Sequence, residues 1–418
     1  MAQLSDDCFA FGGELMKAAE AIRILADRVA PVATPETVPL TVARGRTLAE
    51  DLVAQRDVPP HDNAAVDGYA VYFDDLAPDG ETRLRVTGRV AAGHALLEPA
   101  ERGAAVRIFT GAPMPKGPDT LFMQEDVRVE GDAIVLPPGI KRGANRRKAG
   151  EDVKSGTTIL RKGQRLRPQD IGLAASIGAA RLSVYNILKV GIFSTGDELR
   201  EPGEQTPPGA VYDANRYVLR ALLDQLGCDV KDFGIVPDRK DQIRQTLTNA
   251  AVTCDAVITS GGMSTGDEDH VRAALEALGS IHFWRLAIRP GRPVALGHVK
   301  GTPFVGLPGN PVAMMVTFLR FARPVLLRLG GAVDIEPKTF RVRADFDTKK
   351  KEGRREWLRA RLLPGPDGTP VAKRFPRDGA GILTSLVESD GLIELPEDVT
   401  QVASGTMVDF LPFSEVGV

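Results

Sequence analysis

The sequence has 418 residues, with 43% hydrophobic and 26% charged side chains, a composition typical of a soluble globular protein of about two to four domains. A net charge of −2 gives no overall attraction to nucleic acid or to an anionic membrane, so we expect neither as a partner. The three cysteines have no metal-ligand spacing, and we find neither a signal-peptide pattern nor an apolar run of about 18 residues. These features predict a cytoplasmic protein without a disulfide framework.

The first half of the chain changes from helix to strand and back. Residues 13–30 carry apolar side chains at helical spacing, which predicts an amphipathic helix that ends before Pro31. Residues 53–147 contain short runs in which apolar and polar side chains alternate between Gly and Pro turns, so we expect a β-rich unit there. Residues 148–185 have a mixed pattern, with one helix expected to begin at Pro168 and to continue through the segment RLSVY.

The second half predicts two further units. From residue 186 to 331, continuous apolar strands alternate with amphipathic helices, which is typical of a doubly wound α/β domain. One of these helices has Asp213 as its expected cap and Gly227 as its expected end. Residues 332–418 return to strand-like runs, so the whole is expected to be a multidomain α/β plus β protein.

Three glycine-containing loops follow expected strands of the α/β unit. Their sequences are FSTGDELREPG at 193–203, TSGGMSTGDEDH at 259–270 and GLPGNPVA at 306–313. Glycine lets backbone N–H groups approach an anion, and ligands of such sheets bind beyond the carboxyl ends of the strands. The loops match neither a Walker motif nor a G-x-G-x-x-G fingerprint. One such loop alone is more often a tight turn, but three in one sheet favour a phosphate-binding site.

Acidic side chains on or near these loops are candidate ligands for Mg²⁺, which prefers carboxylate and substrate oxygens. The alternative is that several of them only cap helices. The residues concerned are Asp197, Glu198, Asp238, Asp267, Glu268 and Asp269.

The segment FWRLAIRPGRP, residues 283–293, predicts an anion-binding cluster of arginines. Arg285 and Arg289 are four residues apart on a strand-like run and would lie on one face, and the following Pro-Gly turn would bring Arg292 back beside them. Guanidinium groups form bidentate bonds with oxyanions. A solvated basic edge is the alternative interpretation.

The string PHDNAAVDGYAV, residues 60–71, is unusual because its Asp, Asn and Gly residues disfavour a regular strand, yet its centre is apolar. We therefore expect a loop rather than a ladder strand. A second polar segment, ANRRKAGED at 144–152, has Glu151 and Asp152 as the expected partners of Arg146 and Arg147.

The order of these motifs resembles one known family. DNAAVDGYAV, TGAPMP, NRRKAGED, STGDEL, SGGMSTGDEDHV, RPGRP and GLPGNPV occur in this order over roughly residues 14 to 412, as in the molybdopterin molybdenumtransferases of the MoeA and gephyrin E-domain family. The resemblance implies four domains, with a C-terminal β-barrel-like domain and an elongated homodimer. The implied ranges are 1–52 with 148–185 for domain I, 53–147 for domain II, 186–331 for the MogA-like domain III and 332–418 for domain IV.

The resemblance also implies a reaction in which molybdate enters adenylylated molybdopterin, with Mg²⁺-dependent release of AMP. Each active site would lie between domains III and IV of one subunit and domain II of the other. An adenylyltransferase and apo-molybdoenzymes are further partners that the resemblance suggests. Alternative interpretations are a molybdopterin adenylyltransferase and a non-catalytic scaffold like gephyrin.

By motif matching, the resemblance assigns a role to individual residues. The catalytic carboxylates are Asp67, Glu198, Asp238 and Asp269, of which Asp67, Glu198 and Asp269 would hold Mg²⁺. The expected nucleotide-binding residues are Thr110, Ser194, Gly196, Gly261, Gly262, Ser264, Gly266, Pro308, Gly309 and Asn310. The expected molybdate-binding residues are Arg285, Arg289 and Arg292, where the family usually has lysine. Ala64, Ala313 and Ala380 stand where the family commonly has serine.

Overall fold

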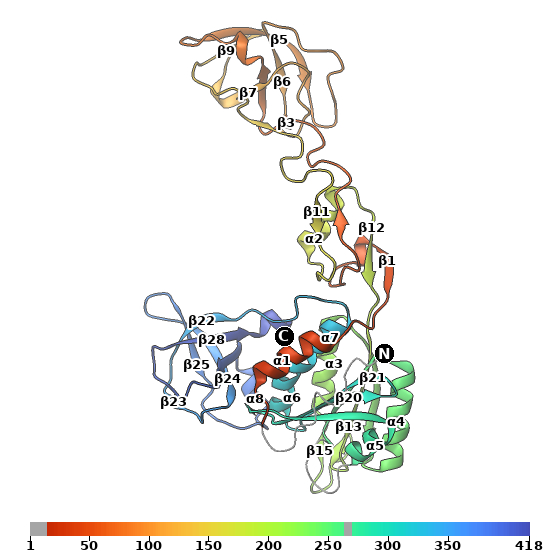
Figure 1. Ribbon diagram of the computed structural model, residues 1–418. Helices are drawn as coiled ribbons and strands as arrows, with labels where there is room; N and C mark the ends of the chain where they lie inside the picture. The colour runs from red at the N-terminus through yellow and green to blue at the C-terminus, as the bar shows by residue number, and fades with distance from the viewer. Residues whose placement is uncertain (1–14, 263–269) are drawn as a thin grey trace.

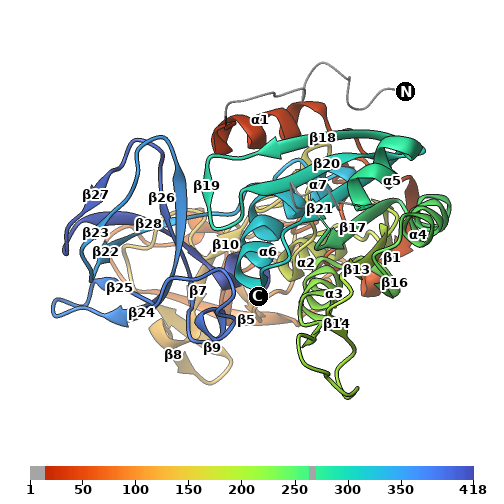
Figure 2. The same ribbon diagram turned by 90° about the horizontal axis from the view of Figure 1, so that it is seen from below.

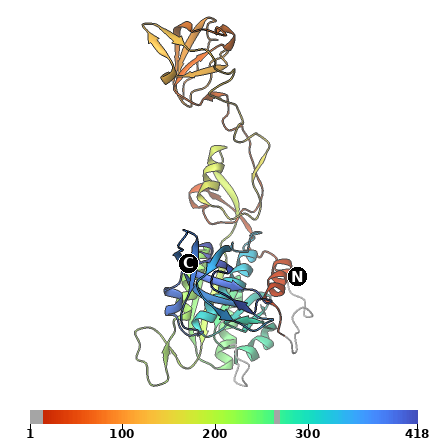
Figure 3. The same cartoon turned by 90° about the vertical axis from the view of Figure 1, so that its left-hand side faces the viewer.

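The computed structural model describes residues 15–262 and 270–418, and these form an elongated molecule (Figure 1). A small sheet lies at one end, a slender middle part follows, and most of the chain forms a wide part at the other end. A view turned about the vertical axis shows the same extension (Figure 3). We call these parts the distal sheet, the neck and the base. The base contains the α/β sheet, called the body, and the C-terminal strands, called the barrel. The four domain boundaries stay a prediction.

The distal sheet has six strands, in the order β7-β4-β6-β5-β9-β8. Their bounds are Thr120–Met123, Gly68–Val71, Ala104–Ile108, Thr82–Val90, Ala133–Leu136 and Arg128–Glu130. The strand β4 corrects the sequence-based expectation, since GYAV is a fully buried strand between β6 and β7. Gly68 allows this pairing, because a Cβ there would overlap the carbonyl oxygen of Phe122.

The neck consists of short strand pairs and one helix. The pairs are β1 (Pro35–Pro39) with β12 (Arg181–Tyr185) and β2 (Leu52–Val53) with β11 (Thr158–Leu160). A third pair, β3 (Asn63–Ala64) with β10 (Arg146–Arg147), lies at the edge of the distal sheet, where Ala64 joins its core (Figure 1). The helix α2 covers Pro168–Ser176 and is shorter than expected. Gly178, at φ +86°, lies in the turn after it, and RLSVY forms β12 instead, because its side chains alternate between the core and solvent.

The body sheet has the order β16-β13-β17-β21-β20-β18, with the first four strands parallel. The strands are β16 (Asp229–Val236), β13 (Lys189–Thr195), β17 (Ala256–Ser260), β21 (Thr302–Leu307), β20 (Pro293–Val299) and β18 (Gly279–Arg285). A short pair, β14 (Leu199–Arg200) with β15 (Val211–Tyr212), extends from the body.

Helices cover both faces of the body sheet, which confirms the doubly wound arrangement. One hydrophobic cluster joins the sheet to α1 (Ala18–Arg28), α3 (Asn215–Leu226), α6 (Pro311–Thr317) and α7 (Arg323–Leu329). A second cluster on the other face joins it to α4 (Lys240–Thr253) and α5 (His270–Leu278). A π-helical turn, Phe318–Ala322, connects α6 to α7, and all its side chains are buried.

The barrel is a closed sheet of five strands, because β24 pairs with both β25 and β26. Its strands are β24 (Arg355–Pro364), β25 (Pro370–Arg374), β22 (Phe340–Ala344), β28 (Met407–Pro412) and β26 (Gly391–Leu395). A short pair, β23 (Thr348–Lys349) with β27 (Gln401–Val402), and the helix α8 (Thr384–Val387) lie beside it. In the described ranges no helix is long and apolar enough to cross a bilayer.

The strand β19 (Ile288–Arg289) ties the barrel to the body by pairing in parallel with β24 (Figure 2). This pairing corrects the interpretation of residues 283–289 as one strand. The chain leaves β18 at Arg285 and enters a different sheet at Ile288, so Arg285 and Arg289 do not share a strand face. The barrel also packs against the π-helical turn, where the Phe321 and Trp357 rings meet edge to face at a centroid distance of 6.2 Å.

Candidate active site

The described parts of the three expected glycine-containing loops lie together at the carboxyl ends of parallel strands. Gly261 donates its N–H to Leu307 O at 3.1 Å, and a Cβ on Gly309 would lie 3.7 Å from the Cα of Gly261. A Cβ on Gly261 would lie 2.8 Å from Thr195 O, so the loop after β17 needs glycine to approach the end of β13. The loops containing Ser194, Gly196, Gly261, Gly262, Pro308, Gly309 and Asn310 are therefore neighbours.

Asn215, at the start of α3, joins two of these loops. Its Nδ2 donates to Ser260 Oγ and to Gly309 O, both at 2.7 Å, and the residue is 91% buried. The sequence analysis missed this residue, although an Asn opening a helix beside a strand-end loop is a detectable signal. The hydroxyl groups of Ser194 and Thr195 are buried nearby without a hydrogen-bond partner in the described chain. Such buried groups are normally satisfied, so a polar ligand would suit them.

The acidic candidates of the body lie on adjacent strand ends. Asp197 and Glu198 follow β13, Asp238 follows β16, and Asp197 Oδ1 accepts a hydrogen bond from the Asp238 amide at 3.2 Å. Glu198 is exposed. Three other candidates, Ser264, Gly266 and Asp269, lie outside the described residues, together with Asp267 and Glu268.

Asp67 and Thr110 meet on the distal sheet, far along the chain from one another. Asp67 Oδ1 accepts hydrogen bonds from the Thr110 amide at 2.7 Å and from the Thr110 hydroxyl at 2.8 Å. These bonds, the backbone one first, lower the pKa of Asp67 below its usual value, and the nearby charge of Arg107 lowers it further. Within one chain, however, both residues lie on a different part of the molecule from the body loops (Figure 1).

A cavity of about 270 Å³ lies between the body and the barrel. The strand β19 supplies Arg289 and the turn after it supplies Arg292, both expected from the sequence. The barrel supplies Arg354 and Arg359, which were not expected. The side chain of Arg285 lies outside the described part of the structure. Arg359 is 95% buried, between the apolar Leu358 and Ala360 of the pattern EWLRARLLP, and this apolar flanking is the signal in the sequence.

Hydrogen bonds fix the buried guanidinium of Arg359. It donates to Ser385 Oγ at 3.0 Å and to the carbonyl oxygens of Arg377 and Gly379 at 3.2 and 3.3 Å. Burial lowers the pKa of Arg359, and the neighbouring Asp378 partly restores it. No carboxylate of the described residues lies within ion-pair distance of Arg359.

Two carboxylates partly neutralise the other cavity arginines. Arg289 lies 3.2 Å from Asp378 and 3.6 Å from Glu356, and Glu356 also forms an ion pair with Arg354. Burial raises the pKa of Asp378, but the hydrogen bond and charge of Arg374 and the charge of Arg289 hold it below the usual value. The cavity is therefore a positively charged site with one carboxylate on its rim.

The loop after Asp378, which lines part of the cavity, also contacts the strand-end loops of the body. Val312, at the start of α6, donates its N–H to Ala380 O at 2.9 Å, and a Cβ on Gly381 would lie 3.8 Å from Asn310 Oδ1. The GLPGNPV loop and the Gly379–Gly381 segment are thus in contact. An anion in the cavity would lie beside a ligand held by the body loops.

Two smaller expectations concern the distal sheet and neck. Arg146 lies 3.5 Å from Asp62, so the expected pairing with Glu151 or Asp152 is wrong for this arginine. Glu151 instead accepts a hydrogen bond from the Lys148 amide at 3.1 Å. Ala64 is fully buried in an apolar cluster, and a serine hydroxyl there would need a polar partner inside this core.

The described residues do not by themselves show the expected magnesium site, and Asp269, one of its expected ligands, lies outside them. Across residues 15–262 and 270–418, no three His, Cys, Asp or Glu side chains converge as metal ligands do. The available carboxylates still suit Mg²⁺, because Glu198 is exposed and both hydrogen bonds from Thr110 to Asp67 go to Oδ1, which leaves Oδ2 for another ligand. These two carboxylates lie on different parts of the molecule, Glu198 after β13 of the body and Asp67 before β4 of the distal sheet.

Family models and relatives agree along the chain. Residues 16–178 match the MoeA N-terminal region (domain I and II), residues 191–328 match a probable molybdopterin binding domain, and residues 341–413 match the MoeA C-terminal region (domain IV). The molybdopterin molybdenumtransferase of Haemophilus influenzae is 37% identical over 386 residues, covering 91% of this chain and 94% of that protein. That of a Nostoc species is 36% identical over 381 residues, with 88% and 87% covered.

A solved structure has the same architecture. The molybdopterin biosynthesis MoeA protein from Pyrococcus horikoshii superposes with a TM-score of 0.82 at 32% identity, covering 96% of this chain and all of that chain. Sequence and structure therefore agree over nearly the full length. The chain belongs to the MoeA family of molybdopterin molybdenumtransferases.

Proposed function

We propose that this protein is the transferase that inserts molybdate into adenylylated molybdopterin, releasing AMP and molybdenum cofactor. The observation that carries the proposal is the arginine-lined cavity beside the glycine loops of the body. Relatives named for this transfer match over nearly the whole chain. The free thiols of Cys228 and Cys254 agree with the reducing, cytoplasmic location that we propose for it.

The charges of the cavity suit a divalent oxyanion. Among the described residues, Arg292 and Arg359 form no ion pair with a carboxylate, whereas Arg289 and Arg354 are paired with Glu356 or Asp378. Arg292 and Arg359 thus keep positive charges that no carboxylate of the described residues pairs with, which suits a dianion such as molybdate. The buried, hydrogen-bonded Arg359 needs no reorientation when the anion binds, and this preorganisation favours the transition state.

The body loops would hold the nucleotide end of the substrate. Backbone N–H groups around Gly261 and Gly309 can approach phosphate oxygens, and Asn215 keeps these two loops together. The hydroxyls of Ser194 and Thr195 would gain partners from the same ligand. Contact between the GLPGNPV loop and Ala380 would then place the pterin sulfurs beside the cavity.

Asp67 would complete the site from the partner subunit of a homodimer. Its hydrogen bonds to Thr110 keep it ionised and oriented, which suits a carboxylate that positions a cation or a water molecule. Glu198 and Asp67 would hold Mg²⁺, and the ion would neutralise the phosphoanhydride oxygens as the bond to AMP breaks. The protein's own part is to orient the substrate and to exclude water from the cavity.

The direct test uses purified protein, adenylylated molybdopterin, Mg²⁺ and molybdate. We expect AMP release that depends on molybdate, together with a product that activates an apo-molybdoenzyme. An adenylyltransferase would instead consume ATP and molybdopterin without needing molybdate. Absence of AMP release with every oxyanion tried would contradict the proposal.

A further inference from the structure

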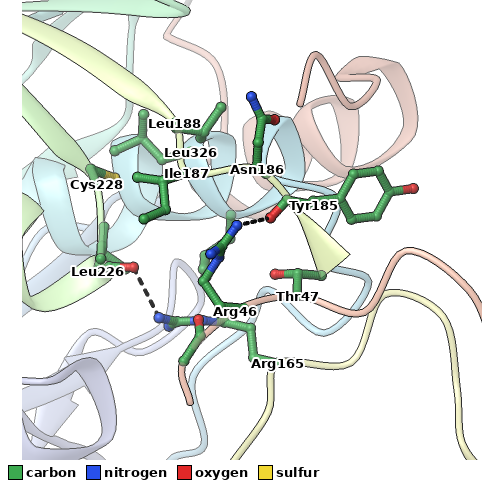
Figure 4. Close-up of a pocket in the computed structure, with 14 residues that line it drawn as sticks. Arg46, Thr47, Arg165, Tyr185, Asn186, Ile187, Leu188, Leu226, Cys228 and Leu326 are labelled. Carbon is green, nitrogen blue, oxygen red and sulfur yellow. Dashed lines mark hydrogen bonds between the residues drawn. The ribbon is translucent and has the colours of Figure 1, made fainter. Parts of the chain in front are cut away.

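A second, smaller cavity lies where the neck meets the body (Figure 4). The neck supplies residues 45–47, Arg165 and residues 185–188, and the body supplies the end of α3 and one face of α7. Its volume of about 50 Å³ is enough for about four water molecules or one phosphate-sized anion. The cavity is separate from the arginine-lined site between body and barrel, because the two share no lining residue.

The polar groups that line this cavity are rich in donors. Arg46, Arg165, Thr47 and Asn186 contribute two guanidinium groups, a hydroxyl and an amide, and no described Asp or Glu lines the cavity. The rest of the lining is mainly apolar, with Leu188 and Leu326 visible across from the arginines (Figure 4). Such a surface favours an anion over a cation or a neutral sugar.

Arg165 carries a positive charge that the described protein does not compensate. Its Nε donates to Gly45 O at 3.2 Å and its Nη2 to Leu226 O at 3.0 Å, but no carboxylate lies within 4.0 Å of it in the described ranges. Arg46 differs, because it forms an ion pair with Glu36 and donates to Tyr185 O at 2.7 Å. The Nη1 group of Arg165 has no hydrogen-bond acceptor in the described chain.

A neighbouring arginine, Arg323, adds positive charge close to Arg165. Arg323, one turn before Leu326 on α7, is 91% buried, and its Nε has no hydrogen-bond partner in the described residues. Burial, followed by the charges of Arg165 and Arg320, lowers the pKa of Arg323 to about 10. The charge of the half-buried Arg165 beside the buried Arg323 is unfavourable, and an anion in the cavity would offset it.

Thr47 supplies an independent indication of a ligand. The residue is 92% buried, lines the cavity, and its hydroxyl has no hydrogen-bond partner among the described residues. Figure 4 shows it beside Arg46 and Arg165. This hydroxyl is therefore available to donate a hydrogen bond to, or accept one from, a group inside the cavity.

From these contacts we propose that the cavity binds a small tetrahedral oxyanion of the phosphate class, held by Arg165, Arg46 and Thr47. The anion would join the neck to the C-terminal end of α3 through Arg165. It would therefore stabilise the arrangement of the neck, and with it the distal sheet, relative to the body. This inference does not depend on the proposed reaction.

The test measures binding of inorganic phosphate by calorimetry at constant ionic strength, with chloride as the balancing anion. The purified full-length protein is compared with Arg165→Gln, Thr47→Val and the matched control Arg161→Gln, which changes an exposed arginine of the same segment. Each protein is also prepared with the additional substitution Arg359→Gln, because this substitution should remove phosphate binding at the larger cavity. In that background we expect one phosphate per chain, at least tenfold weaker binding with Arg165→Gln, weaker binding with Thr47→Val, and no change with Arg161→Gln.

Two outcomes would overturn this proposal. One is that the Arg359→Gln protein binds no phosphate. The other is that Arg165→Gln and Thr47→Val, shown to be folded by circular dichroism, bind phosphate as tightly as their parent. If only Arg359→Gln abolished phosphate binding, all of the bound phosphate would lie in the larger cavity. The proposed reaction would then stand, and the proposed second site would be wrong.

Discussion

At the scale of single residues, Asp67 and Thr110 show how a local contact sets the chemistry of a carboxylate. Both a backbone and a side-chain donor of Thr110 point at one oxygen of Asp67. The ionised form is thereby favoured, so the group is an anion at neutral pH and has one oxygen left for another ligand.

We expect Thr110→Val to raise the pKa of Asp67 toward the usual value without restoring it fully, since the amide bond remains. Because the folded pKa is depressed, the stabilising effect of Asp67 is present above its unfolded pKa and is lost as the pH falls through the folded pKa. Carboxylate NMR of the wild-type and variant proteins measures this shift. The same pKa in both proteins would show that the Thr110 hydroxyl has no such effect.

Arg359 is the residue on which the oxyanion cavity most depends, because it is buried and unpaired. Arg359→Gln should lower kcat/KM for molybdate by about 100-fold, since a fixed cationic donor is lost. Arg361→Gln, on the same strand but outside the cavity, is the matched control and should leave this value unchanged. Equal effects of the two substitutions would argue against a specific role for Arg359.

The sequence identified only part of this cavity. Arg289 and Arg292 stand in a recognisable motif, but Arg354 and Arg359 lie more than 60 residues later in another sheet. Their convergence depends on the pairing of β19 with β24, which no local pattern indicates. Asp378 is likewise placed beside Arg289 only by the fold.

At the scale of elements, the distal sheet depends on the absence of a side chain in β4. Gly68→Ala should destabilise this sheet by about 2–3 kcal/mol, because the new methyl group would overlap Phe122 O within the ladder. Gly80→Ala is the control, since a Cβ there meets no atom within 4 Å. Urea unfolding of both variants tests this, and equal midpoints would contradict it.

Asn215 joins two loops of the body and is expected to act on binding as well as on stability. Asn215→Ala should destabilise the body by about 1–3 kcal/mol, because Gly309 O and Ser260 Oγ lose a buried donor, and it should raise KM for the nucleotide substrate. Asn249→Ala, on the exposed side of α4, is the comparison. An unchanged KM in Asn215→Ala would show that Asn215 does not affect substrate binding by these loops.

Most elements of the body and barrel could be predicted from periodicity, since their strands and helices have uniform patterns. The predictions were wrong for segments whose secondary structure depends on the strand with which they pair. RLSVY has enough apolar residues for a helix but pairs with β1, and GYAV follows Asp and Asn residues that disfavour a strand but lies inside its sheet. Tertiary pairing overrides local preference at such short segments.

At the scale of the whole molecule, the distal sheet and the body of one chain lie at opposite ends (Figure 1). Motif order and fold class could be predicted from the sequence, but no physical property of a short motif reveals which distant segments meet in an assembly. The distance between Asp67 and the body loops is therefore a finding of the structure. It is the reason that the proposed site requires two subunits.

The most direct test of this account is complementation between two inactive variants. Asp67→Asn and Arg359→Gln each remove one half of the proposed site, and co-expression with different tags allows mixed dimers to be isolated. A mixed dimer would contain one site with both substitutions and one site with neither, so its molybdate-dependent AMP release should be about half that of the wild-type dimer. Each variant alone should be almost inactive, and a mixed dimer as inactive as its parents would contradict a site shared between subunits.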